Sequence, residues 1–261
     1  MGGWVQNVAL KVVLTPLLVG GASLAGRRWG HQIGGWLVGL PLTSGPVAYF
    51  LATEHGTGFA AQAAVGMLAG TTSQVAFALA YRAAARRGLL AAFTTGCVAF
   101  AAATVGLTYL HWSALPTFAL VAASLAVGYA LTRRPHRPAE NAFIASKPPR
   151  WDIPVRMAVA TAVVLAVTAL APIIGAHLAG LLSPFPVFGV VLTMFAHHNH
   201  GASAASAVLD GLIIGLAAPA VFFLAITLTL PPLGLLAFAV GALAALLSQA
   251  ATMFVIPASS P

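Results

Sequence analysis

The chain has 261 residues, of which 60% are hydrophobic and 6% are charged, and its net charge is +8. Soluble domains carry about 25% charged residues, so this composition cannot cover a water-facing surface and excludes a soluble enzyme or a DNA-binding domain. The single cysteine, Cys97, has no intrachain partner, which excludes a disulfide scaffold.

Apolar segments follow one another along the chain, separated by charged, polar or Gly/Pro-rich positions. Most are close to the roughly 20 residues that a helix needs to cross a bilayer core of about 30 Å. The pattern therefore predicts an all-α polytopic membrane protein with about nine transmembrane helices. Their expected ranges are 5–25, 31–53, 57–81, 89–110, 113–132, 153–174, 176–198, 202–228 and 232–256.

The basic residues set the expected orientation of these spans, because Lys and Arg prefer cytoplasmic loops. An N-terminus outside the cell places every basic loop inside. These loops contain Arg27, Arg28, Arg82, Arg86, Arg87, Arg133, Arg134, Arg137, Lys147 and Arg150. We therefore expect a multi-pass protein of the cell inner membrane with a cytoplasmic C-terminus. The alternative for the first segment is a cleaved signal peptide, since Lys11 precedes an apolar run and Ser23-Leu24-Ala25 resembles a cleavage site.

The two halves of the chain resemble each other at an offset of 145 residues. The identities include Pro, Phe, His and several glycines, which composition alone does not explain. They pair Gly30, Pro41, Phe50, His55, Gly56, Gly66, Gly70 and Phe77 with Gly175, Pro186, Phe195, His200, Gly201, Gly211, Gly215 and Phe222. This predicts a duplication: repeat 1 in 1–110, repeat 2 in 153–261, and a linker helix with a cytoplasmic loop in 111–152.

Four spans plus one linker span is an odd number, so the second repeat is expected to enter the membrane with the opposite orientation. Inverted repeats of this kind are common in secondary transporters, in which they interconvert outward-open and inward-open states. The alternative is a duplication that serves folding alone, as in some channels.

The second span of each repeat contains two prolines close together. Proline removes a backbone donor and clashes with the preceding turn, so each helix should open near the bilayer centre and line a cavity there. The sequence therefore predicts a substrate site with the second helix of each repeat broken. Its expected residues are Pro41, Thr43, Ser44, Gly45, Ser183, Pro186, Gly189 and Gln74.

Each of these assignments has a structural alternative. The prolines could produce simple kinks in which Thr43, Ser44 and Ser183 bond to the freed carbonyls. Gln74, like Gln249 in the last span, could bond to a neighbouring helix and line no cavity.

Asp210 is the only carboxylate deep in a predicted span, and an intramembrane acid is a default candidate for a proton or cation site. We expect it to couple transport to an ion gradient; the alternative is a structural ion pair with Arg156. The paired glycines Gly66 and Gly70, with Gly211 and Gly215, predict close helix packing and no chemistry.

Histidines cluster at the cytoplasmic end of the seventh span, in His197, His198 and His200. Their repeat counterparts at the outer face are Glu54 and His55, so both groups are candidates for a gate or substrate mouth. Two histidines at i, i+3 could also bind a transition metal, although no nearby Cys or carboxylate completes the coordination sphere. The shared His-Gly pairs, ending at Gly56 and Gly201, predict a turn that closes each broken helix.

Together these patterns favour a secondary transporter that moves a small molecule or ion by alternating access, as a symporter or antiporter. No nucleotide-binding or hydrolase motif is present, so we expect no enzyme activity, no cofactor, no resident metal and no nucleic-acid partner. Membrane lipid is an expected partner, and the sequence leaves open whether the protein is a homo-oligomer. The alternatives are a passive channel on the same scaffold, or a membrane enzyme or metal-binding protein that uses the histidine cluster.

Overall fold

The computed structural model describes residues 38–110, 113–132 and 151–253, with isolated positions between 9 and 36. Within these residues the protein is all-helical. The helices are α3 (Ser44–His55), α4 (Thr57–Ala84), α5 (Leu89–Thr108), α6 (Ala114–Thr132), α7 (Asp152–Leu182), α8 (Val187–Gly215), α9 (Ala217–Leu233) and α10 (Ala237–Met253), with short 3-10 turns η1 (Ala85–Arg87) and η2 (Gly234–Leu236).

Five helical stretches in the described residues are long and apolar enough to cross a membrane. They are Thr57–Arg87, Leu89–Thr108, Ala114–Thr132, Ile153–Leu182 and Val187–Met253. The last one contains α8, α9 and α10, and the expected number of nine crossings stays a prediction. The first predicted span, with its signal-peptide alternative, lies largely outside the described residues.

Glycines divide the longer stretches because they adopt positive φ at little cost. Gly175 has φ 80° inside α7, and Gly201 has φ 80° inside α8. Gly56 separates α3 from α4 with φ 89°. Gly88 and Gly234 take positive φ before α5 and at the end of α9. The turns expected at the two His-Gly pairs are therefore confirmed.

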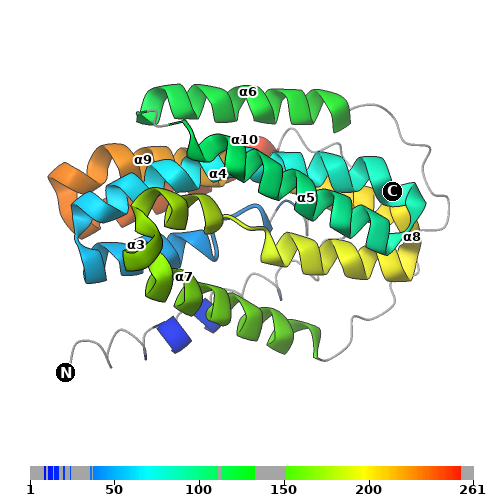
Figure 1. The fold of residues 1–261 in the computed structure, drawn as a ribbon, viewed down its shortest axis with the longest axis horizontal. Helices are drawn as coiled ribbons and strands as arrows, with labels where there is room; N and C mark the ends of the chain where they lie inside the picture. The colour runs from blue at the N-terminus through cyan, green and yellow to red at the C-terminus, as the bar shows by residue number, and fades with distance from the viewer. Residues whose placement is uncertain are drawn as a thin grey trace.

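The helices lie side by side along the long direction of the molecule, with α4 in the middle and α6 and α7 on opposite sides (Figure 1). Helix α4 contacts α3, α5, α6, α7, α8 and α9. The most apolar part of α4 is 67% buried, whereas those of α5, α6 and α7 are each 22% buried. Helix α4 therefore lies at the centre of the bundle, and α5, α6 and α7 expose apolar side chains on its outside.

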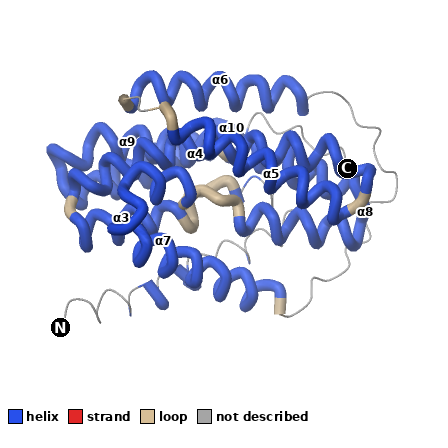
Figure 2. The backbone as a smooth tube through the Cα atoms, in the orientation of Figure 1, coloured by secondary structure: helices blue, strands red, loops and turns tan. Residues whose placement is uncertain are grey.

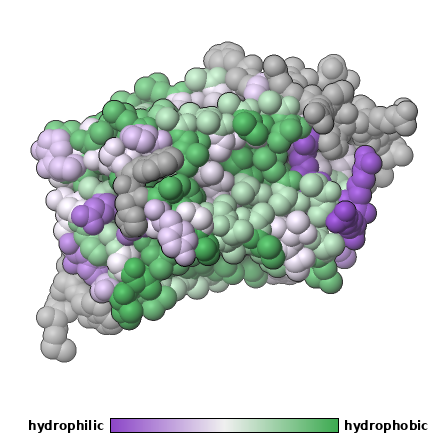
Figure 3. Space-filling view, turned by 45° about the horizontal axis from the view of Figure 1, so that its top comes forward, coloured by the Kyte–Doolittle hydropathy of each residue, from purple (hydrophilic) through white to green (hydrophobic). Residues whose placement is uncertain are grey.

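The exposed surface carries the pattern expected of a protein embedded in lipid. Leu90, Val98, Leu115, Ile173 and Leu243 are all more than half exposed. On the face drawn in Figure 3, hydrophobic residues cover the middle, and hydrophilic residues gather at the two ends of the helices. A hydrophobic belt with polar ends buries apolar side chains in hydrocarbon and keeps charges in water. The described structure therefore supports a membrane-embedded helical protein.

Two helices are interrupted at the proline segments that the sequence singles out. Trp36 and Val38 are helical, residues 39–43 are not, and α3 then begins at Ser44. In the second case α7 ends at Leu182, and α8 begins at Val187. Figure 2 draws both interruptions as loops near the middle of the molecule. From there α3 runs to one end of the bundle and the first part of α8 runs to the other (Figure 1).

Candidate functional site

The two interruptions have the same backbone hydrogen bonds. At the first, the Leu42 amide donates to the Leu40 carbonyl at 2.7 Å, and the Gly45 amide donates to the Pro41 carbonyl at 2.8 Å. At the second, the Val187 amide donates to the Phe185 carbonyl at 2.8 Å, and the Val190 amide donates to the Pro186 carbonyl at 2.7 Å.

Each proline lies at the centre of a three-residue turn, and its carbonyl then accepts an early bond of the following helix. Pro186 has φ −81° and ψ 60°, the geometry of an inverse γ-turn. Proline suits this position because its ring fixes φ and because the turn needs no donor from its nitrogen. Pro41 and Pro186 are therefore the residues that open the two helices.

Most other residues predicted for the substrate site are packed at the interruptions. Thr43, Ser44 and Ser183 are buried. The Ser183 hydroxyl donates at 2.6 Å to the Ala179 carbonyl, which also accepts from the Ser183 amide and is therefore not a carbonyl freed by the prolines. A Cβ added at Gly189 would lie 3.1 Å from Leu212, and one at Gly45 would lie 3.7 Å from the Phe222 ring. Both glycines therefore face neighbouring helices.

Gln74 brings α4 to the second interruption. Its side-chain amide nitrogen donates to the Pro184 carbonyl, one of the carbonyls that the interruption frees from helical bonding. At the first interruption, the side-chain amide nitrogen of Gln249 in α10 donates to the Trp36 carbonyl at 2.8 Å. The amide oxygens of both glutamines are buried and have no partner within the described part of the chain. Each interruption thus has a buried acceptor beside it.

The glycine stripes bring the helices into close contact beside the interruptions. A Cβ on Gly66 would lie 2.5 Å from the His177 carbonyl, and one on Gly70 would lie 2.9 Å from the Leu181 carbonyl and from Pro184. Gly215 faces the Trp36 backbone in the same way, and Gly39 faces Gly215. The sequence prediction of close packing is confirmed at these positions. The interruptions are therefore held against the middle of α4 and the end of α8.

Lys11 and Glu54 form an ion pair that is almost enclosed. The Lys11 ammonium lies 2.6 Å from one Glu54 carboxylate oxygen and donates to the other at 2.8 Å. It also donates to the Thr168 hydroxyl at 2.9 Å and lies 5.2 Å from the centre of the Phe50 ring. These contacts join the N-terminal segment to α3 and α7. Glu54, predicted as a gate residue, thus forms a largely enclosed ion pair with Lys11.

Arg82 and Asp210 form a second ion pair. The Arg82 Nε lies 3.0 Å from an Asp210 carboxylate oxygen. The guanidinium also donates to the Leu131 and Thr132 carbonyls at 2.9 and 3.3 Å. The described partner of Asp210 is therefore Arg82; the side chain of Arg156, the partner weighed from the sequence, lies outside the described residues.

The predicted gate histidines differ in burial and in the residues they contact. His197 is buried, and its Nδ1 lies 3.0 Å from the Tyr81 hydroxyl. His198 is exposed and His200 is half-buried. His55 stacks at an angle on Phe59, with ring centres 5.1 Å apart. Among the described residues no group of three or more His, Cys, Asp or Glu side chains could hold a metal ion.

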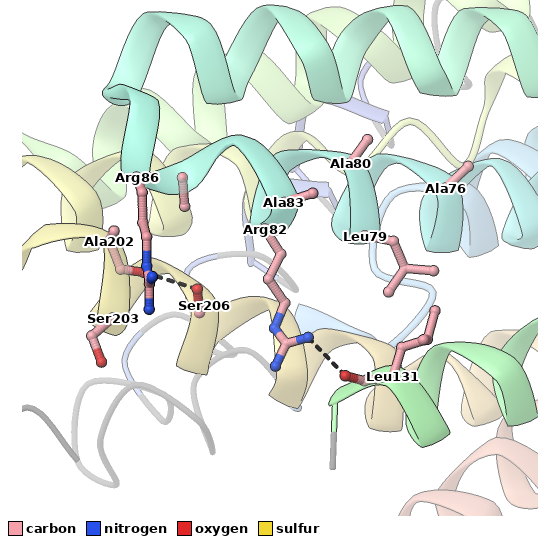
Figure 4. Close-up of a pocket in the computed structure, with 11 residues that line it drawn as sticks. Ala76, Leu79, Ala80, Arg82, Ala83, Arg86, Leu131, Ala202, Ser203 and Ser206 are labelled. Carbon is pink, nitrogen blue, oxygen red and sulfur yellow. Dashed lines mark hydrogen bonds between the residues drawn. The ribbon is translucent and has the colours of Figure 1, made fainter. Parts of the chain in front are cut away.

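A pocket of about 810 Å³ opens beside the Arg82–Asp210 pair. It is lined by one face of α4, by η1, by the end of α6 and by the second part of α8 (Figure 4). Its lining residues are Ala76, Leu79, Ala80, Arg82, Ala83, Ala85, Arg86, Leu131, Ala202, Ser203 and Ser206. Sequence analysis assigned none of them to a site, because α4 continues to Ala84 and so carries Arg82 on a helix where a loop was expected.

The structure also identifies functional candidates that the sequence analysis passed over. Lys11, Arg82 and Tyr81 contact the predicted site residues Glu54, Asp210 and His197, and Thr168 contacts Lys11. The signal for the two cations was present: charges at the ends of apolar spans need partners, and each repeat contains one carboxylate, Glu54 or Asp210. Nothing in the sequence separated Tyr81 or Thr168 from the other hydroxyl residues of the spans.

Comparison of this chain with protein-family models, with curated proteins and with solved structures gives no match. The functional argument therefore rests on the geometry of the interruptions, the ion pairs and the pocket.

Proposed function

We propose that the protein is a secondary transporter that moves a small solute by alternating access. In this proposal two inverted repeats, 1–110 and 153–261, place their broken helices against each other at the middle of the membrane. The observation that carries it is the pair of proline turns at Pro41 and Pro186, with hydrogen bonds at the same relative positions 145 residues apart. A shared turn at a shared position favours a duplicated functional element over an incidental kink.

Two further features support the inverted arrangement. The positive-φ glycines Gly56 and Gly201, also 145 residues apart, follow α3 and the first part of α8. These two helices run from the interruptions to opposite ends of the bundle (Figure 1). Opposite directions at equivalent positions are what two repeats with an axis in the membrane plane require.

The proposed solute site lies between the interruptions. Gln74 and Gln249 hold freed carbonyls there, and their amide oxygens offer acceptors to a polar solute. Polar backbone in the membrane is tolerated where it is buried or lines a cavity, so the occluded interruptions fit a site that opens only during the transport cycle.

The two ion pairs supply the gates and the coupling of the proposed carrier. Lys11–Glu54 closes one end of the bundle, and Arg82–Asp210 lies at the other end. Asp210 is the proposed coupling residue: protonation would remove its charge, weaken its attraction to Arg82 and free α4 to move against α8. No step requires catalysis, so the proposal does not include an enzyme.

Membrane topology tests the inverted repeats directly. In a Cys97→Ala background, single cysteines at Gly58, Arg87, His198 and Leu235 sample four loop regions. An impermeant maleimide added outside the cell should label Gly58→Cys and Leu235→Cys, and should reach Arg87→Cys and His198→Cys only after permeabilisation. Labelling of Gly58→Cys and His198→Cys from the same side would contradict the inverted repeats.

Flux measurements on proteoliposomes test transport itself, with amino acids, carboxylates and alkali cations as probes and a trapped pH dye as readout. Saturable flux that collapses with the proton or sodium gradient supports a carrier. Flux that neither saturates nor depends on a gradient would indicate a channel and contradict alternating access. Ser44→Phe should abolish carrier flux at normal protein levels, because the added ring would fill the first interruption.

A further inference from the structure

The pocket between α4, η1, α6 and α8 is separate from the interruptions and has polar and apolar parts. Arg86, Ser203 and Ser206 line one end of it, and Ala76, Leu79 and Ala80 line the other (Figure 4). The residues on α4 are ordered in the same way along the helix axis. With a rise of 1.5 Å per residue, Ala76 lies roughly 15 Å from Arg86, well inside the apolar belt.

Among the described residues at the polar end, Arg82, Arg86 and Asp210 together carry one positive charge. Arg82 lies 3.0 Å from Asp210, which balances its charge. Arg86 is exposed and lines the pocket on the side of Ala202 and Ser206, away from the Arg82 guanidinium (Figure 4). Ser203 lies two residues after Gly201, where helical geometry restarts, and the Ser206 hydroxyl donates to the Ala202 carbonyl at 2.9 Å. This end therefore suits a group with a single negative charge and oxygen acceptors.

The apolar end suits a hydrocarbon chain. Leu79 and Ala80 are half-buried and line the pocket beyond the guanidinium of Arg82. A free inorganic anion would leave this apolar surface uncovered, whereas the acyl chain of a lipid would fill it.

We propose that this pocket binds an anionic phospholipid, with its phosphodiester at Arg86 and Ser203 and an acyl chain along Leu79 and Ala80. A phosphodiester carries one negative charge and accepts hydrogen bonds from guanidinium and hydroxyl groups. The bound lipid would contact η1 and the second part of α8 together. It would therefore stabilise the arrangement of α4 against α8 that the Arg82–Asp210 pair also holds.

The test is a binding titration of the purified full chain, read by native mass spectrometry and thermal shift. The probes are phosphatidylglycerol, phosphatidylcholine and inorganic phosphate. We expect phosphatidylglycerol to be retained and to raise the melting temperature, and the other two to have little effect. Equal retention of phosphatidylcholine, or stabilisation by inorganic phosphate without lipid retention, would overturn the proposal.

Variants locate the site. Arg86→Gln should weaken retention of phosphatidylglycerol roughly tenfold, as expected when a charge-assisted hydrogen bond is lost. The matched control is Arg87→Gln, which removes the same charge from the next residue outside the pocket lining and should leave retention unchanged. Equal losses in both variants would show a general surface-charge effect and overturn the site.

A second variant tests the apolar half and does not touch the charge. Ala80→Phe should block the chain and reduce retention of phosphatidylglycerol while Arg86 stays in place. Unchanged retention in a folded Ala80→Phe protein would overturn the placement of the chain. This variant also keeps the proposal testable if Arg86→Gln fails to fold.

Discussion

The two ion pairs lie at opposite ends of α4 and differ in how tightly they are enclosed. The side chains of Lys11 and Glu54 are 6% and 17% exposed, and Thr168 and Phe50 complete the surroundings of the ammonium. Arg82 and Asp210 are 10% and 22% exposed, and Arg82 lines an open pocket. Both pairs are thus largely enclosed, the Lys11–Glu54 pair somewhat more tightly, and a pocket opens beside the Arg82–Asp210 pair. Under the proposed transport cycle, this arrangement corresponds to a carrier closed at the end that holds Lys11 and Glu54, which the expected orientation places outside.

The largest expected effect comes from breaking the Lys11–Glu54 pair, which is the more enclosed of the two. Lys11→Met leaves Glu54 nearly buried without a counter-charge, which should lower the free energy of unfolding by about 3–5 kcal/mol. Thermal or denaturant unfolding of the purified protein measures the loss. The double variant Lys11→Met, Glu54→Leu removes both charges and should recover most of the stability. If the single and double variants were equally unstable, the pair would not be what seals this end.

Breaking the Arg82–Asp210 pair should lower the stability less than breaking the Lys11–Glu54 pair, but it should reduce transport more. Asp210→Asn keeps the shape of the side chain but removes its charge, and Arg82 retains the Leu131 and Thr132 carbonyls as acceptors. We expect a loss of about 1.5–3 kcal/mol, as for one hydrogen bond to a charged group.

Flux in proteoliposomes then separates the two roles of Asp210. Gradient-driven flux should disappear in Asp210→Asn at a normal level of folded protein. Normal gradient-driven flux in this variant would leave the residue a purely structural role.

Thr168→Val tests how much the third partner of Lys11 contributes. The change is nearly isosteric and removes a hydroxyl that accepts from the ammonium at 2.9 Å. We expect the free energy of unfolding to fall by about 1.5 kcal/mol. Thr161→Val, on an earlier turn of the same helix, is the control, because the Thr161 hydroxyl bonds to the Met157 carbonyl of its own helix. Equal losses in both variants would count against a special role for Thr168.

The smallest effect is expected at the contact between Tyr81 and His197, at the same end of α4 as the Arg82–Asp210 pair. Tyr81→Phe removes the hydroxyl that lies 3.0 Å from the His197 ring and keeps the aromatic packing. A neutral hydrogen bond contributes about 1 kcal/mol, and the unfolding free energy should fall by that amount. A change well above 2 kcal/mol would indicate that this end is as tightly enclosed as the other.

The sequence predicted the parts of the fold that depend on local chemistry. Prolines at 41 and 186 mark the interruptions, and the two His-Gly pairs mark turns, because each residue type restricts its own backbone. The glycine stripes indicated close packing for the same reason. Composition and hydropathy indicated a membrane-embedded helical protein.

The site contacts were less accessible to sequence reasoning because they join residues far apart in the chain. Arg82 was expected in a loop, and Asp210 was weighed against Arg156, since nothing local shows that α4 continues one turn further. Lys11 and Glu54 each fall near the end of an apolar segment, and only the packing of those segments determines that the charges meet. The pocket likewise depends on how α4, α6 and α8 are spaced.

The tie between α10 and Trp36 has a consequence for biosynthesis. Gln249 bonds to the Trp36 carbonyl, and the Trp36 indole donates to the Thr252 hydroxyl at 2.9 Å. Both partners are among the last described residues to leave the ribosome. Until they arrive, the Trp36 indole lacks its Thr252 acceptor, and the Trp36 carbonyl has only the Gly39 amide as a donor. A nascent chain stalled before α10 would therefore expose the kind of defect that membrane quality-control proteases remove.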